Sequence, residues 1–121
     1  MGFWRKKKEK TDLNWNEIQT LEELKKAYHS TEEKAALFFK HSTRCGISKM
    51  VLNRFESEWE NDENYTLYFI DLLAHRNVSD TLSEWSGVEH QSPQVIVIKN
   101  EAVVYDASHN GIKTSIIKKI I

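Results

Sequence analysis

Apolar residues follow two different spacings along the chain, and these spacings predict where strands and helices lie. Residues 35–39 form a continuous apolar run, which is typical of a strand covered on both faces. Residues 65–73 are rich in aromatic and branched side chains and predict a second strand. Further strands are predicted at 94–99 and 102–105, joined by a short hairpin turn, and a brief strand is expected within 11–16.

Four other segments carry apolar residues at helical spacing, and each predicts a helix with one buried face. These faces comprise Ile18, Leu21, Leu24 and Tyr28; Ile47, Met50, Val51, Phe55 and Trp59; Val78, Leu82 and Trp85; and Ile112, Ile116, Ile117 and Ile120. Alternating strands and helices predict parallel pairing, whereas the last two strands predict an antiparallel hairpin. We therefore expect an α/β fold with a central mixed sheet of four to five strands, flanked by about four helices.

The composition is that of an ordinary globular protein. Its 121 residues suffice for one domain, which we expect over residues 11–121 behind a basic tail at residues 1–10. The net charge of −1 provides no overall field that would attract nucleic acid or a membrane. The basic start lacks the apolar region of a signal peptide, and a single cysteine cannot form an internal disulfide. We therefore expect a cytoplasmic monomer without nucleic-acid or membrane partners.

The only cysteine, Cys45, lies where the apolar strand at 35–39 gives way to a helix. A helix N-terminus presents unpaired N–H groups and a partial positive charge, and neighbouring Arg44 adds a cation. Both favour the thiolate, which is the nucleophilic form of cysteine. The alternative from the sequence alone is a buried and inert thiol, which is common for free cysteines.

Two neighbours of Cys45 have alternative roles. Ser48 lies three residues on, across the first helical turn, where its hydroxyl can donate a hydrogen bond to the thiolate or can be a plain polar group. Gly46 either lets the backbone of a partner approach closely or only relieves crowding.

Three segments together resemble the monothiol bacilliredoxins, small general-stress proteins of the bacillithiol system that have the thioredoxin fold. The segments are HSTRCGIS at 41–48, HQSPQ at 90–94 and SH at 108–109, and the resemblance covers residues 12–121. It implies that Cys45 attacks the mixed disulfide of an S-bacillithiolated client protein and takes bacillithiol onto itself. Bacillithiol would be the co-substrate, no metal would be needed, and a low-molecular-weight thiol or an external reductase would regenerate Cys45.

Two positions depart from the wider patterns of the thioredoxin fold. Ser48 stands where dithiol relatives have a resolving cysteine, so the resolving thiol must come from outside. Phe39 stands where thioredoxins carry a buried carboxylate. Both departures argue against general disulfide reduction.

The resemblance also implies a substrate-binding set around Cys45. It implies a cis peptide bond before Pro93, which would leave the backbone of Ser92 free to pair with substrate. The strand that ends at Tyr105 runs back toward the cysteine end, so His109 would bind a carboxylate of bacillithiol, polarise the leaving thiol or only cap a helix. Thr43 and His90 complete the expected set, whereas His41 is expected only to pack.

Two other functions stay open at this point. A monothiol glutaredoxin-like iron–sulfur carrier also uses a Cys-Gly-x-Ser motif, but it needs a cationic glutathione site, for which Lys40 offers thin support. A binding module that has kept the fold and lost the reaction is the second alternative. No cysteine–histidine spacing resembles a structural zinc site.

Overall fold

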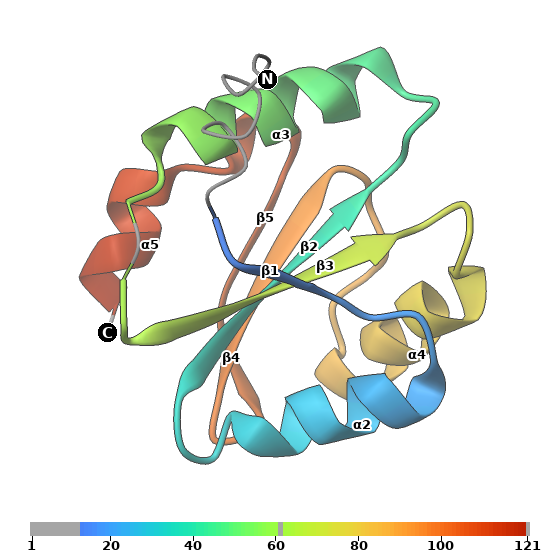
Figure 1. Ribbon diagram of the computed structural model, residues 1–121, viewed down its shortest axis with the longest axis vertical. Coiled ribbons are helices and arrows are strands. Elements are labelled where there is room, and N and C mark those ends of the chain that lie inside the picture. The colour runs from blue at the N-terminus through green and yellow to red at the C-terminus, as the bar shows by residue number, and fades with distance from the viewer. Residues whose placement is uncertain (1–12, 61, 121) are drawn as a thin grey trace, which may run out of the picture.

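The computed structural model describes residues 13–60 and 62–120. Five strands form one sheet in the order β1-β3-β2-β4-β5 (Figure 1). The strands are β1 (Trp15–Glu17), β2 (Ala35–His41), β3 (Tyr65–Asp71), β4 (Gln94–Lys99) and β5 (Ala102–Ser108). The helices are α2 (Leu21–Ser30), α3 (Gly46–Glu58), α4 (Arg76–Ser86) and α5 (Thr114–Ile120), with a short 3₁₀ helix η1 (His109–Gly111) before α5. The expected tail at 1–10 lies outside the described residues.

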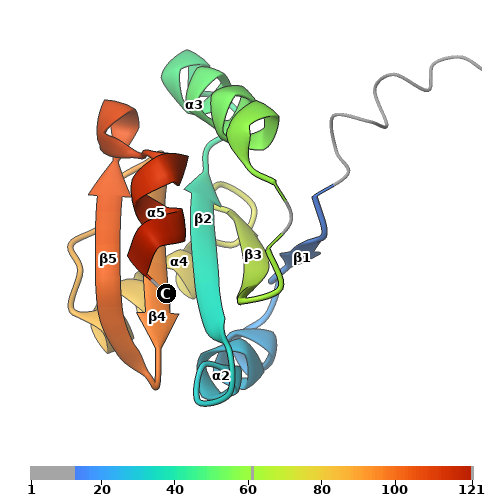
Figure 2. The same ribbon diagram turned by 90° about the vertical axis from the view of Figure 1, so that its left-hand side faces the viewer.

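The sheet is mixed, as the order of elements predicts. β3 pairs in parallel with both β1 and β2, and β4 pairs antiparallel with β2 and β5. Figure 2 shows β2 in the middle of this sheet, with β4 and β5 on one side and β3 and β1 on the other. Because β2 and β3 are parallel, their carboxyl ends share one edge of the sheet, and the loops that follow them meet there.

Helices cover both faces of the sheet (Figure 1). One core cluster packs α3 and α5 against the face of β2 that carries Leu37 and Phe39. The other packs α2 and α4 against the face that carries Phe38. All seven residues of β2 are buried. The continuous apolar run predicts this for residues 35–39, whereas the burial of the polar Lys40 and His41 is not predicted. None of the helices in the described ranges is long and apolar enough to span a bilayer.

The expected inner face of α3 is partly wrong. Ile47 and Met50 are 54% and 70% exposed, whereas Ser48, Val51 and Phe55 face the sheet. Successive helical residues are about 100° apart, so residues directly before the buried stripe point sideways into solvent. A similar shift exposes Leu21 in α2, Trp85 in α4 and Ile116 in α5. Ile112 is buried but precedes α5.

Candidate active site

Cys45 is the N-cap residue of α3 and lies just beyond the end of β2. Its side chain makes no capping hydrogen bond, and the residue is partly exposed. The backbone oxygen of Cys45 accepts the hydrogen bond of the Lys49 N–H at 3.1 Å, which starts the helical ladder. The sulfur is therefore attached where the first N–H groups of α3 have no partner within the helix.

Hydrogen bonds of Ser42 and Ser48 hold the turn before Cys45. The backbone N–H of Cys45 donates to the oxygen of Ser42 at 3.2 Å. The N–H of Ser42 in turn donates to Oγ of Ser48 at 3.1 Å. Ser48 is fully buried, so its hydroxyl links the first turn of α3 to the end of the preceding strand.

The same hydroxyl contacts His41, a buried residue whose role in the site is not predicted from the sequence. Nδ1 of His41 lies 2.7 Å from Oγ of Ser48, and the ring packs 5.6 Å from that of Phe69. Burial lowers the pKa of His41; nearby Lys49 lowers it further, whereas Asp71 opposes the shift. We therefore treat this imidazole as neutral at pH 7. Only the packing of α3 on β2 brings the two side chains together, so no local pattern in the sequence predicts the contact between His41 and Ser48.

These contacts correct the expectation that the Ser48 hydroxyl donates a hydrogen bond to the Cys45 thiolate. Its hydroxyl bonds to His41 and Ser42, and the described residues include no hydrogen bond between Ser48 and Cys45. The side chain points from the inner face of α3 toward the strand end, because that face is buried against the sheet. Ser48 thus holds the turn that presents the thiol.

The loop at Ser92 and Pro93 lies at the same sheet edge. The peptide bond between Ser92 and Pro93 is cis, as the resemblance implies. Gln94, the first residue of β4, pairs with Lys40 near the end of β2 and with Ser108 at the end of β5. The loops beside Cys45, before Gln94 and after Ser108 therefore meet at one edge.

His109 is tied directly to this loop. Its backbone N–H donates to the oxygen of Pro93 at 3.0 Å, and its φ of 52° lies in the left-handed region. Such a φ is unfavourable for a residue other than glycine and is held here by surrounding contacts. Arg54 of α3 donates to the oxygen of Ile112 at 2.8 Å, which anchors the segment after η1 to the cysteine helix. The structure thus brings His109 to the edge that the topology predicts.

His90 turns one side of its ring inward. Nδ1 lies 3.4 Å from Nζ of Lys40 and 3.3 Å from Oγ of Ser79. Burial lowers the pKa of His90, and the charges of Lys40 and Arg76 add to this shift. The Nδ1 side is therefore occupied within the protein and is not presented to a substrate.

Lys40 is fully buried beneath the same loop, on the face of the sheet opposite α3. Its amine donates to the oxygen of Ser79 at 3.0 Å and to Oγ of Ser83 at 2.9 Å. Burial lowers the pKa of Lys40 to about 8. A buried amine is not available to bind glutathione from solution, which removes the support that Lys40 lends to the cluster-carrier hypothesis.

The surface around Cys45 is open and mixed in character. Thr43, Arg44 and Gly46 are exposed beside it, and the apolar side chains of Ile47 and Met50 follow. A Cβ atom placed on Gly46 would meet no atom within 4 Å. Crowding within the protein therefore does not explain this glycine, and close approach of a partner remains the working hypothesis.

Comparison with known sequences decides the family. The family described as monothiol bacilliredoxin BrxC matches residues 16–117. The chain belongs to the monothiol bacilliredoxin family.

Solved structures confirm the thioredoxin fold of this bacilliredoxin. A thioredoxin-fold protein shares 22% identity at a TM-score of 0.69, covering 88% of this chain and 92% of its own. Thioredoxin from Malassezia sympodialis shares 16% identity at a TM-score of 0.65, with 85% and 84% covered. Thioredoxin from Fasciola hepatica shares 14% identity at a TM-score of 0.67, with 87% and 95% covered. At these identities the likeness concerns the fold alone.

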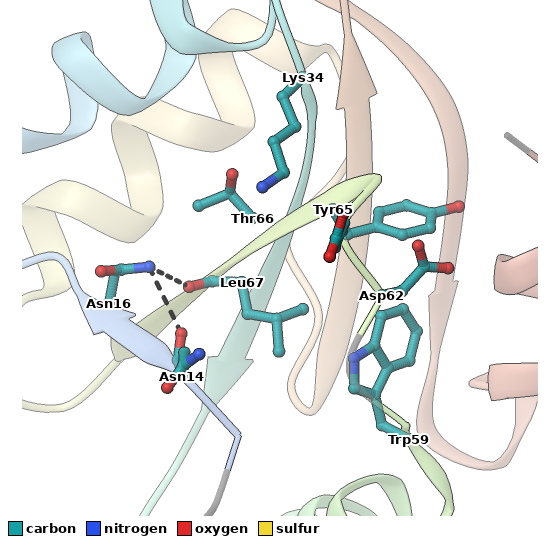
Figure 3. Close-up of a pocket in the computed structure, with 9 residues that line it drawn as sticks. Asn14, Asn16, Lys34, Trp59, Asp62, Tyr65, Thr66 and Leu67 are labelled. Carbon is teal, nitrogen blue, oxygen red and sulfur yellow. Dashed lines mark hydrogen bonds between the residues drawn. The ribbon is translucent and has the colours of Figure 1, made fainter.

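A surface pocket of about 300 Å³ lies at the other end of the bacilliredoxin sheet (Figure 3). It is lined by the start of β3, including Tyr65 and Thr66, and by Trp59 and Lys34. Asn16 also lines the pocket, and its side-chain amide donates a hydrogen bond to the backbone oxygen of Leu67 at 3.1 Å. Because β3 begins here and ends at the edge near Cys45, this pocket is not part of the cysteine site.

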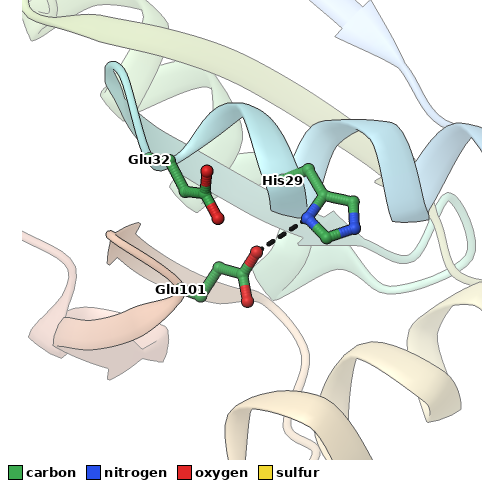
Figure 4. Close-up of side chains that lie close together, drawn as sticks. All are labelled: His29, Glu32 and Glu101. Carbon is green, nitrogen blue, oxygen red and sulfur yellow. Dashed lines mark hydrogen bonds and ion pairs between the residues drawn. The ribbon is translucent and has the colours of Figure 1, made fainter.

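A group of potential metal ligands also lies away from Cys45 (Figure 4). His29, Glu32 and Glu101 place one ligand atom each within 4.8 Å of the others, and all three are exposed. Nδ1 of His29 and a carboxylate oxygen of Glu101 lie 2.7 Å apart. We describe the group as an exposed ion pair between the end of α2 and the β4–β5 turn, with Glu32 beside it.

Proposed function

We propose that this protein removes bacillithiol from client proteins by thiol–disulfide exchange at Cys45. The single observation that carries the proposal is the placement of the only cysteine as the accessible N-cap of α3 in a member of the bacilliredoxin family. Fold and family support a thiol–disulfide oxidoreductase. The identity of the transferred thiol follows from the family resemblance.

The first step is an exchange of disulfide bonds. The Cys45 thiolate attacks the bacillithiol sulfur of the client mixed disulfide and forms a new S–S bond with it. The client sulfur leaves as a thiolate and takes a proton from water. The client cysteine is thereby reduced and Cys45 is oxidised to its mixed disulfide with bacillithiol.

The second step needs a thiol from outside, since the chain has one cysteine. A low-molecular-weight thiolate or a reductase attacks the bacillithiol sulfur, forms a new disulfide with it and releases the Cys45 thiolate. Ser48 cannot replace this thiol, because a hydroxyl does not perform the exchange. We propose that the cycle runs in the cytoplasm, where a reducing thiol pool is available.

Substrate would bind across the edge where the three loops meet. The unpaired N–H groups of α3 and the exposed Arg44 would stabilise the attacking thiolate. The backbone of Ser92 beside Pro93 and the ring of His109 would contact the mixed disulfide from the opposite side. Thr43, Ile47 and Met50 would contact the client surface. His90 would support the loop from within through its Lys40 contact.

A single transfer reaction tests the proposal. A client protein carrying bacillithiol on one cysteine is mixed with the reduced protein, and both partners are weighed by mass spectrometry over time. We expect the mass of bacillithiol to leave the client and to appear on Cys45. A Cys45→Ser variant should leave the client modified. The proposal fails if the wild-type protein acquires no bacillithiol while the client stays modified.

A further inference from the structure

Two large apolar side chains are exposed on α3 at the end where Cys45 lies. Ile47 is 54% exposed and Met50 is 70% exposed, and both belong to the first two turns of the helix. The exposed residues further along α3 are polar, namely Asn53, Ser57 and Glu58. Single exposed apolar residues are common on protein surfaces, but these two are neighbours at helical spacing beside the thiol. We call this pair, Ile47 and Met50, the apolar strip.

A contact of Arg54 shows which way the apolar strip faces. The guanidinium of Arg54 donates to the oxygen of Ile112 at 2.8 Å, so this side of α3 faces the segment after η1. Ile47 precedes Arg54 by seven residues and Met50 precedes it by four. Residues at these spacings lie on the same side of an α-helix. The apolar strip therefore lies on the η1 side of α3.

The opposite side of α3 faces β1 and is charged near Cys45. Nε1 of Trp15 donates to a carboxylate oxygen of Glu56 at 2.9 Å, which places Glu56 on the β1 side. Lys49 precedes Glu56 by seven residues and is exposed, so it lies on that side as well. The start of α3 thus presents an apolar side toward η1 and a cationic side toward β1.

The loops expected to hold substrate lie on the apolar side. His109 begins η1, and its backbone N–H donates to the oxygen of Pro93. Pro93 precedes β4, and β4 and β5 lie on one side of β2, whereas β3 and β1 lie on the other. A client whose sulfur reaches Cys45 past Ser92 and His109 therefore passes along the apolar strip, on the side away from Lys49.

We propose that the apolar strip selects client proteins in which apolar side chains flank the modified cysteine. During the exchange the client sulfur is separated from Cys45 by one bacillithiol sulfur, so the neighbouring client residues lie over the first turns of α3. Covering Ile47 and Met50 with apolar side chains removes both surfaces from water. Because methionine adapts to different shapes, the strip distinguishes apolar from polar flanks without demanding one particular residue.

Two synthetic peptides test this inference without bacillithiol. Both are octapeptides with a central cysteine capped by a methylthio group, and the cysteine is flanked by leucine in one and by serine in the other. The Cys45 thiolate attacks either sulfur and displaces methanethiolate or the peptide thiolate, and mass spectrometry follows the loss of the mixed disulfide. Each rate is divided by the rate of the same peptide with glutathione, which removes differences in intrinsic reactivity. We expect the leucine peptide to react about tenfold faster. Equal normalised rates would overturn the proposal.

Variants of the apolar strip locate the selectivity. Ile47→Ser and Met50→Gln should each reduce the ratio of the two rates about threefold, and the double variant should bring it to about one. Because the readout is a ratio, a loss of folded protein affects both peptides equally. A double variant that keeps the ratio of the wild type would overturn the proposal.

Ile116→Ser is the matched control, since Ile116 is an isoleucine that is 45% exposed on α5. The next residue, Ile117, accepts a hydrogen bond from the hydroxyl of Tyr65 at the start of β3, which lies at the far end of the sheet from Cys45. Ile116→Ser should therefore keep the ratio of the wild type. An equal loss of selectivity in this variant would contradict a role specific to the apolar strip.

A second copy of the chain is the competing occupant of the apolar strip. Sedimentation of the reduced protein over a range of concentrations should show a monomer for both the wild type and Met50→Gln. A dimer that Met50→Gln dissociates would overturn the assignment to clients.

This inference rests on the proposed function, but the peptide test uses neither bacillithiol nor a client protein. Selectivity between the peptides without transfer of bacillithiol would reject the proposed function alone. Transfer of bacillithiol without this selectivity would reject only the role of the apolar strip.

Discussion

Nζ of Lys40 lies 3.4 Å from Nδ1 of His90, and this contact joins the buried end of β2 to the segment that leads into Ser92 and Pro93. Neither of the two ion pairs among the described residues includes Lys40. A buried charge without an ionic partner normally destabilises a fold.

Replacing Lys40 should therefore stabilise the protein. The pKa of Lys40 falls from 10.5 to about 8, which corresponds to a penalty of about 3 kcal/mol at pH 7. Loss of the hydrogen bonds to Ser79 and Ser83 offsets part of it. We expect Lys40→Met to raise the free energy of unfolding by about 1–2 kcal/mol at pH 7, measured by urea denaturation.

The pH dependence of this gain follows from the direction of the shift. Below about pH 8 the folded protein holds a charged Lys40, and the penalty is present in full. Between about pH 8 and 10.5 the folded state releases this proton before the unfolded state does, so the penalty disappears. The advantage of Lys40→Met should vanish near pH 10.5. Exposed Lys34→Met is the control, and an equal gain there would refute the burial argument.

Mild acid should destabilise the protein through His41 and His90. Burial lowers the pKa of both residues, so the unfolded chain takes up protons first as the pH falls below about 6.5. The free energy of unfolding should therefore decrease from pH 7 toward pH 5. His90→Gln should flatten this decrease in a series of urea titrations, whereas exposed His29→Gln should not. Parallel curves for the wild type and His90→Gln would contradict the contribution of His90.

A second thiol at position 48 should change how the reaction ends. Ser48→Cys introduces a thiol three residues after the reacting cysteine, at the place of the resolving cysteine in dithiol relatives, and we expect it to resolve the mixed disulfide at Cys45 within the chain. Bacillithiol should then be released without an external thiol, as followed by mass spectrometry. Wild type and Ser48→Ala should retain it, and retention by Ser48→Cys would show that its sulfur cannot reach Cys45.

The same substitution should weaken the fold. A thiol is a weak donor and acceptor, so the hydrogen bonds to His41 and Ser42 are largely lost. We expect Ser48→Cys in its reduced form to lower the free energy of unfolding by about 1–3 kcal/mol, measured by urea denaturation. A reduced variant as stable as the wild type would show that these bonds contribute little.

Replacing Gly46 by alanine should separate the effect of this position on stability from its effect on client recognition. An added Cβ meets no atom within 4 Å, so Gly46→Ala should fold as stably as the wild type or slightly more so. If a client backbone approaches this position, transfer from a protein client should slow about tenfold while alkylation by iodoacetamide is unchanged. Asn53→Ala, an exposed position further along α3, is the matched control. Unchanged client transfer in Gly46→Ala would remove the proposed approach at this position.

The sequence by itself determined the α/β order, the mixed sheet and the position of Cys45 between a strand and a helix. Apolar spacing and a continuous buried run are local signals, and they predict β2 and α3 without knowledge of the packing. The single cysteine also showed that any resolving thiol must come from outside. Topology alone indicated that the His109 loop returns to the cysteine edge.

Only the tertiary structure decided which polar groups face each other. His41 contacts Ser48 seven residues away, and Lys40 contacts His90 fifty residues away. The same packing turned Ser48 inward and left Ile47 and Met50 exposed. The physical reason is that apolar periodicity specifies which stripe of an element is buried only approximately, whereas the partner of a buried polar atom depends on how whole elements dock against the sheet.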